Sequence, residues 1–135
     1  MFDTKIVIIV REDLKNWQKL NVTAFLTSGV VGANPDLIGA PYEDASGQRY
    51  SPLLIQPMIV LTTDAPGLAR IHHRALNRNV QMAIYIEDMF KTGHDVANRA
   101  AVQHYKTEDL DLVGIALREE KKIVDKITKG AKMHP

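Results

Sequence analysis

The run Ile6-Val7-Ile8-Ile9-Val10 constrains the fold more than any other feature of this sequence. Every side chain in it is apolar and β-branched, a composition that favours a strand buried on both faces. Strands of this kind lie at the centre of sheets that helices cover on each side. The run therefore predicts an α/β domain with this segment as a central strand.

The rest of the chain alternates between strand-like and helix-like segments. Short apolar runs predict three further strands, at residues 58–61, 80–86 and 112–117. Apolar spacing and capping residues predict four helices, at about residues 16–31, 64–76, 96–105 and 119–129. We expect Asn16 to cap the first helix, and we expect His72 to point inward and His73 outward from the second. This alternation predicts a three-layer α/β/α sandwich in which helices cover both faces of a small sheet.

Residues 39–57 differ from the segments around them. Pro41, Pro52 and Pro57 interrupt any regular element, and Ala45-Ser46-Gly47-Gln48 predicts a turn between Tyr42 and Tyr50, giving a small hairpin. Long irregular stretches often carry binding functions, but a plain surface excursion is an equally good interpretation.

Length and composition exclude several classes of protein. The 135 residues suffice for one domain, expected to span residues 1–135. Seventeen basic side chains against sixteen acidic ones argue against a surface built throughout for nucleic acid, although six of the basic residues fall within residues 118–135. The absence of cysteine excludes disulfides and thiol catalysis. We expect a cytoplasmic protein that does not associate with membranes.

The common cofactor and metal motifs are missing. There is no glycine-rich phosphate loop, no Gly-x-Ser-x-Gly sequence and no His-Glu-x-x-His pattern among the five histidines. We therefore expect neither a cofactor nor a metal site.

Two charged clusters follow expected strand ends: Arg11-Glu12-Asp13 and Glu87-Asp88. In open α/β sheets, ligands bind in the crevice beyond the strand ends. Asp13 and Glu87 are thus candidate substrate-binding residues.

A second constellation joins Lys19 and Thr23 on the first helix with Asp88 and Thr92 after the third strand. Lys19 and Thr23 are four residues apart and project from one side of the helix. If the first and third strands run parallel and lie close together, these groups share one rim. An ammonium, a carboxylate and two hydroxyls could stabilise an oxyanion and orient a water. The alternative is a surface ion pair with capping threonines, worth about 0–1 kcal/mol.

The order of these features resembles type-2 peptidyl-tRNA hydrolases. The resemblance is carried by the first strand with Arg11 and Asp13-Leu14, by Lys19, and by Ile84 through Thr92. It implies a four-stranded mixed sheet with at least one antiparallel strand. It also implies functional roles for Lys19, Asp88 and Thr92.

Several positions depart from that family's pattern. Gln18, Thr23 and Leu26 stand where the family has glycine, glutamine and histidine, and Met89-Phe90 replaces Ala-Gly. The segment 17–26 is similar instead to a bacterial family of unknown function that shares the hydrolase fold. The departures favour a protein that has diverged from peptidyl-tRNA hydrolysis and binds an unidentified ligand or partner.

The alternative function is hydrolysis of peptidyl-tRNA or a related acyl ester. Lys19 would stabilise negative charge, Asp88 would activate water, and the hydroxyls of Thr92 and Thr23 would hold the substrate. The expected partners are a small molecule or a tRNA-linked substrate. We also expect a homodimer, because small α/β domains often pair.

Overall fold

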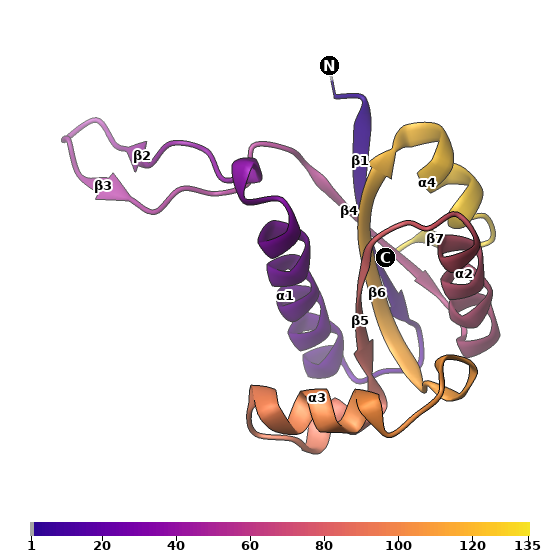
Figure 1. Ribbon diagram of the computed structural model, residues 1–135. Coiled ribbons are helices and arrows are strands. Elements are labelled where there is room, and N and C mark those ends of the chain that lie inside the picture. The colour runs from indigo at the N-terminus through magenta and orange to yellow at the C-terminus, as the bar shows by residue number, and fades with distance from the viewer. Residues whose placement is uncertain (1) are drawn as a thin grey trace.

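The computed structural model of the chain describes residues 2–135, and within them five strands form one mixed sheet (Figure 1). In sheet order the strands are β5 (Met82–Ile86), β6 (Leu112–Glu120), β1 (Thr4–Arg11), β4 (Met58–Thr63) and β7 (Lys132–Met133). β1 is parallel to β4, β6 is antiparallel to β1 and β5, and β7 is antiparallel to β4. The α/β class and the mixed sheet are confirmed. The expectation of four strands is wrong, because β7 adds a fifth at the edge of β4.

Helices flank this sheet, as Figure 1 shows. The four helices are α1 (Asn16–Ala33), α2 (Ala65–Asn77), α3 (Asp95–Gln103) and α4 (Lys121–Ile127). α1 covers one face, α2 and α4 cover the other, and α3 lies across one end of the sheet. Short 3-10 segments are η1 (Pro35–Leu37), η2 (Glu87–Lys91) and η3 (Thr107–Asp109). Within residues 2–135, no helix combines the length and the apolar character needed to cross a bilayer.

β1 is the central strand, as its apolar run predicts. Val7 and Ile9 pack into the core under α2 and α4, while Ile6, Ile8 and Val10 pack into the core under α1. All five side chains are at most 1% exposed. Burial on both faces follows directly from the uninterrupted β-branched run.

The ends of several elements differ from expectation. The residue that caps α1 is Lys15 rather than Asn16, which is the first helical residue. The start of α2, in contrast, is as expected: Asp64 caps the helix by accepting a hydrogen bond from the Gly67 N–H at 2.8 Å. β6 extends to Glu120 because its last residues still pair with β1, and α4 is correspondingly shorter than expected.

Close packing holds α1 against β6 at Gly114. A Cβ built at this position would lie 2.5 Å from Val22 Cγ1 and 2.9 Å from Leu26 Cδ1. Both α1 side chains are buried against the sheet. The lack of a side chain at Gly114 therefore sets the distance between α1 and the sheet.

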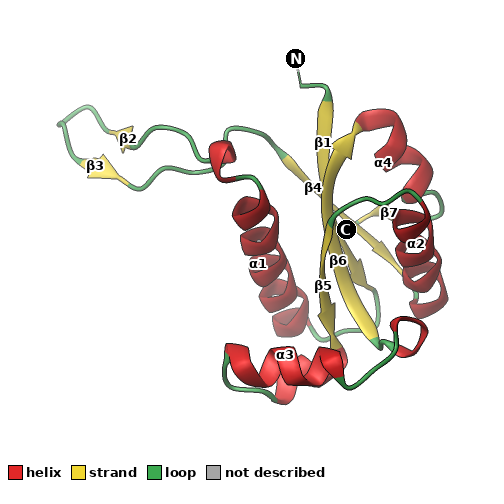
Figure 2. Ribbon diagram, viewed as in Figure 1, coloured by secondary structure: helices red, strands yellow, loops and turns green. Residues whose placement is uncertain are grey.

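The connection between α1 and β4, residues 34–57, projects from the body as an arm (Figure 1). Its outer part carries the expected hairpin, β2 (Tyr42–Glu43) paired with β3 (Arg49–Tyr50). Most of the arm is loop rather than strand (Figure 2). Every residue from 40 to 51 is exposed. The antiparallel pairing of β2 with β3 confirms the prediction of a hairpin.

Candidate functional site

The strand directions gather charged residues at one edge of the sheet. β5 and β1 are both antiparallel to β6, so their carboxyl ends meet the start of β6 at the same rim. Arg11, at the end of β1, forms ion pairs there with Asp13 (2.6 Å), Asp111 (3.1 Å) and Glu87 (3.2 Å). The two charged clusters singled out in the sequence therefore do lie together.

Arg11 is the centre of this rim cluster, defined here as Arg11, Asp13, Glu87 and Asp111. Its side chain is only 13% exposed, and it also donates to the Leu112 carbonyl at 3.3 Å. Burial opposes the charge of the guanidinium, but the hydrogen bond and charge of Asp13, with Asp111 and Glu87, outweigh it and raise the pKa of Arg11. Asp13 and Glu87 are thus engaged in holding three chain segments together.

Asp88 and Thr92 have partners on or next to α3. The Tyr105 hydroxyl donates to Asp88 Oδ2 at 2.7 Å, and this bond to the carboxylate raises the pKa of Tyr105. The Thr92 hydroxyl contacts the Asn98 side-chain oxygen and the Met89 carbonyl. These bonds fasten η2 to α3 and the turn that follows it.

Lys19 and Thr23 lie together on α1, as their spacing predicts. The Thr23 hydroxyl donates to the Lys19 carbonyl at 2.7 Å. Among the described residues no carboxylate lies within 4.0 Å of Lys19 Nζ, so Lys19 and Asp88 form no ion pair. The structure therefore brings Asp13 and Glu87 together but does not join Lys19 to Asp88.

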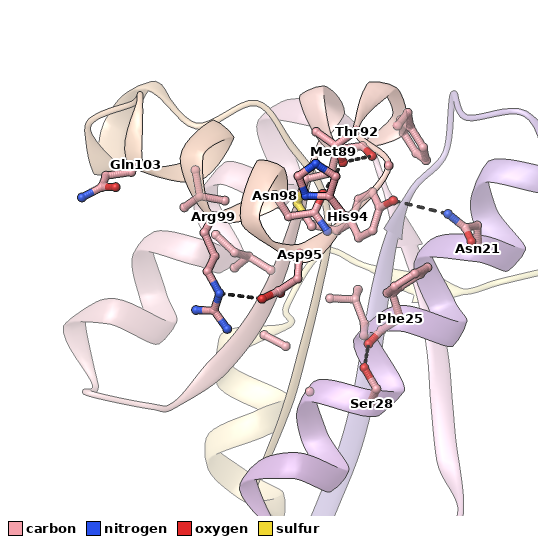
Figure 3. Close-up of a pocket in the computed structure, with 18 of the residues that line it drawn as sticks. Asn21, Phe25, Ser28, Met89, Thr92, His94, Asp95, Asn98, Arg99 and Gln103 are labelled. Atoms are coloured by element: carbon pink, nitrogen blue, oxygen red, sulfur yellow. Dashed lines mark hydrogen bonds and ion pairs between the residues drawn. The ribbon is translucent and has the colours of Figure 1, made fainter.

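A large groove opens beside these residues, between α1 and the η2–α3 segment (Figure 3). Its volume is about 1200 Å³, and β5 forms its floor with Ala83, Ile84 and Tyr85. Thr92 lines it, whereas Lys19, Thr23 and Asp88 do not. We call this space the α1–α3 groove.

Four aromatic side chains line the α1–α3 groove. Tyr85 lies in the middle, with ring centroids 5.3 Å from Phe90 and 6.0 Å from Phe25. Trp17 meets Phe90 edge to face at 5.8 Å. These distances and tilted arrangements are favourable for aromatic pairs. Trp17 and Phe25 are both more than half exposed, whereas Tyr85 between them and the sheet is buried.

Polar groups lie around this aromatic row. Asn21 donates to the Tyr85 hydroxyl at 3.3 Å, and burial raises the pKa of Tyr85. His94 caps α3, with its Nδ1 accepting from the Ala97 N–H at 3.2 Å. The neutral ring then carries its proton on Nε2, which is left as a donor. Asn98 and His94 face α1 across the groove in Figure 3.

This donor set is not that of a metal centre. Within residues 2–135 no three His, Asp or Glu side chains are placed to hold a metal ion together. The groove instead combines aromatic surface with neutral amide, hydroxyl and imidazole groups. That combination is typical of sites for small organic ligands.

Sequence reasoning missed most of the groove. The sequence draws attention to Phe90 and to the segment 17–26, but no pattern in it joins Trp17, Phe25 and Phe90 into one site. Asn21, His94 and Asn98 belong to no motif. One available signal was that Trp17, Asn21 and Phe25 recur every four residues, on a side of the helix different from the buried Val22, Leu26 and Val30. Two aromatic side chains on a second side of one helix indicate a second contact.

Comparison with known proteins identifies relatives but no activity. A family model described as a protein of unknown function (DUF2000) matches residues 4–135. Among solved structures, a protein of unknown function from Agrobacterium strain C58 is 55% identical, with 100% of both chains covered and a TM-score of 0.98. The search of curated proteins found no match.

Proposed function

The chain belongs to the DUF2000 family of proteins of unknown function, and from that premise we propose that it binds a small organic ligand in the α1–α3 groove. The observation that supports this proposal is the row of Trp17, Phe25, Tyr85 and Phe90, whose members Trp17 and Phe25 are exposed, in a groove of about 1200 Å³. Aromatic-lined concavities with a few polar groups are the usual form of such sites.

The lining indicates the chemistry of the ligand. A flat apolar or aromatic group would stack against the exposed faces of Trp17 and Phe25. The amide of Asn98 and the Nε2 proton of His94 would bond a polar substituent on it. Arg99 is paired with Asp95 at 2.8 Å, so the groove offers a ligand little net charge.

Tryptophan fluorescence gives a direct test, because Trp17 is the one tryptophan of the chain and lines the groove. Titration with 8-anilinonaphthalene-1-sulfonate, an aromatic probe, should quench Trp17 and enhance probe emission at one site per chain. Phe25→Ala should weaken the affinity by about tenfold, equivalent to about 1.4 kcal/mol of lost aromatic contact. Phe25 is 54% exposed, so this substitution spares the core.

The matched control is Leu76→Ala, a partly exposed apolar side chain on α2, which covers the opposite face of the sheet. Its probe affinity should equal that of the wild type. Equal affinity in Phe25→Ala, or equal losses in both variants, would contradict binding in the groove.

Hydrolysis of peptidyl-tRNA or a related acyl ester is the second candidate function, and the shared rim favours it. β1 and β5 are parallel with only β6 between them, so the start of α1 and Asp88 lie at the same edge of the sheet. The similarity of the sequence to type-2 peptidyl-tRNA hydrolases, in fold and at Lys19, Asp88 and Thr92, stays a prediction. Catalysis would require Lys19 to approach an Asp88 carboxylate now bound by Tyr105.

The assay for this second function uses an N-acetylated aminoacyl-tRNA. If the protein is a hydrolase, the wild type turns it over, and both Lys19→Ala and Asp88→Asn reduce the rate by at least about 100-fold. Absence of turnover by the wild type removes the hydrolase function and leaves the groove proposal unaffected.

A further inference from the structure

The arm, residues 34–57, exposes an unusual amount of apolar surface. Tyr42, Tyr50, Leu53 and Ile55 are each more than half exposed, and Leu53 reaches 63%. A monomer seldom leaves so many large apolar side chains together in solvent, and where it does they usually mark an interaction site.

Hydrogen bonds give the arm a defined shape. The Asp44 carboxylate accepts from the Ser46 and Gln48 N–H groups, each at 3.0 Å, and from the Tyr50 hydroxyl at 2.8 Å. These bonds hold the pKa of Asp44 below its ordinary value and fix the tip of the hairpin.

The base of the arm is fixed as well. The Ile55 N–H donates to the Leu37 carbonyl at 2.9 Å, and the Gly39 N–H to the Leu53 carbonyl at 3.0 Å. Because the arm is ordered before any partner arrives, docking it costs little conformational entropy.

The outer side of α1 is also uncovered. Leu20 is 73% exposed, and Ala24, one turn later on the same side, is exposed too. This pair borders the groove side of the helix, because Leu20 and Ala24 lie three and seven residues after Trp17. Thus α1 presents a small exposed apolar surface beside the groove.

Charge distinguishes the two surfaces. Residues 14–33 contain Lys15 and Lys19 and no carboxylate, and within residues 2–135 neither lysine has an acidic partner within 4.0 Å. The arm carries Asp36, Glu43 and Asp44 against a single Arg49. The arm is therefore net acidic, and the start of α1 is basic.

We propose that the arm of one copy packs along the outer side of α1 of a second copy, forming a symmetric dimer. Tyr42 and Tyr50, in the hairpin, would cover Leu20. Leu53, at the base of the arm, would pack farther along the partner helix, and the acidic tip would reach Lys15. One contact would be repeated twice, with each copy giving an arm and receiving one, as a two-fold interface requires.

The geometry of the chain suits this exchange. The arm and α1 leave the same corner of the body in different directions (Figure 1). A two-fold axis parallel to the bisector of those directions exchanges them, so an axis displaced from the corner lays the arm of one copy alongside α1 of the other. The 18 residues of α1 are about 27 Å long, and ten residues of extended chain reach roughly 30 Å. The arm is therefore long enough to bring its tip to the start of the partner helix.

Light scattering after size exclusion tests the dimer. The wild type at about 50 µM should have twice the chain mass of 15.1 kDa. Leu53→Ser on the arm and Leu20→Ser on α1 should each raise the dimer dissociation constant at least tenfold. Both side chains are exposed, so neither substitution disturbs the core. The matched control, Val96→Ser on α3, removes a side chain that is 72% exposed and should leave the mass unchanged.

A charge exchange tests the pairing itself. Lys15→Glu and Glu43→Lys should each weaken the dimer at low salt, and the double variant should restore it. A glutamate at position 15 also suits the start of a helix, so loss of folding does not complicate the result. A monomeric wild type at 100 µM overturns the proposal. So does a dimer that Leu53→Ser weakens and Leu20→Ser does not, which would assign the arm to another surface or another protein.

Discussion

Replacing Arg11 with methionine is expected to lower the free energy of unfolding by about 2–3 kcal/mol. Methionine keeps an apolar stem but removes the guanidinium that Asp13, Glu87 and Asp111 share. The expected loss lies between that of an exposed ion pair and that of a buried one, because Arg11 is largely buried while its partners are partly exposed. The pKa of Arg11 is raised, so its contribution is present at neutral pH and is lost only at strongly alkaline pH.

Urea unfolding at neutral pH measures this loss, with Lys5→Met as the control. Lys5 forms a single, more exposed ion pair with Asp125 at 2.7 Å, so its replacement should cost no more than about 1 kcal/mol. Added salt should recover part of the deficit of Arg11→Met by screening the three carboxylates from one another. Equal stabilities for the two variants would show that Arg11 does not hold the rim together.

Gly114→Ala should be about as damaging, at about 2–3 kcal/mol and a fall in Tm on the order of 10 °C. The new methyl group would enter the space of Val22 Cγ1 and Leu26 Cδ1 and push α1 away from β6. Differential scanning calorimetry gives the change in Tm. Because α1 is one wall of the α1–α3 groove, the same variant should also alter the affinity for the fluorescent probe.

Two further variants test whether contact with Val22 and Leu26 causes the loss of stability in Gly114→Ala. Gly32→Ala adds the same methyl group to α1 where no atom lies within 4 Å, and it should stabilise the protein by about 0.5–1 kcal/mol. Val22→Ala combined with Gly114→Ala should recover at least about 1 kcal/mol relative to the sum of the single changes. Additive losses would contradict the close packing of α1 on Gly114.

The fold was predictable where burial leaves a periodic pattern. The run from Ile6 to Val10 predicts a central strand because each of its side chains must be buried on one face or the other. β7 has no such signal, since Lys132 and Met133 are exposed and become a strand only through β4. The Lys15 cap likewise carries no propensity signal, and it is bound instead by Gln18 Oε1, which accepts from the Lys15 N–H at 3.0 Å.

The functional residues were less predictable, because they depend on which surfaces meet. Charged residues next to strand ends predict the rim cluster, but they do not include Asp111. Asp111 immediately precedes β6, and because β6 is antiparallel to its neighbours it starts at the rim where they end. Trp17 and Phe90 become part of one groove only because η2 turns back toward α1. That turn depends on contacts between distant segments.

The register of β1 has a consequence for the order of events during synthesis. Val7 lies beside Ile59 on one side and Leu117 on the other, so the central strand can pair with β4 early but lacks its second neighbour, β6, until nearly the whole chain has emerged. Until then a fully apolar, β-branched segment is available for pairing with other nascent chains. Lys5 and Arg11, at its two ends, are charges of the kind that discourage such pairing. Arg11, which joins the rim cluster in the folded protein, thus also discourages intermolecular pairing of β1 before β6 is available.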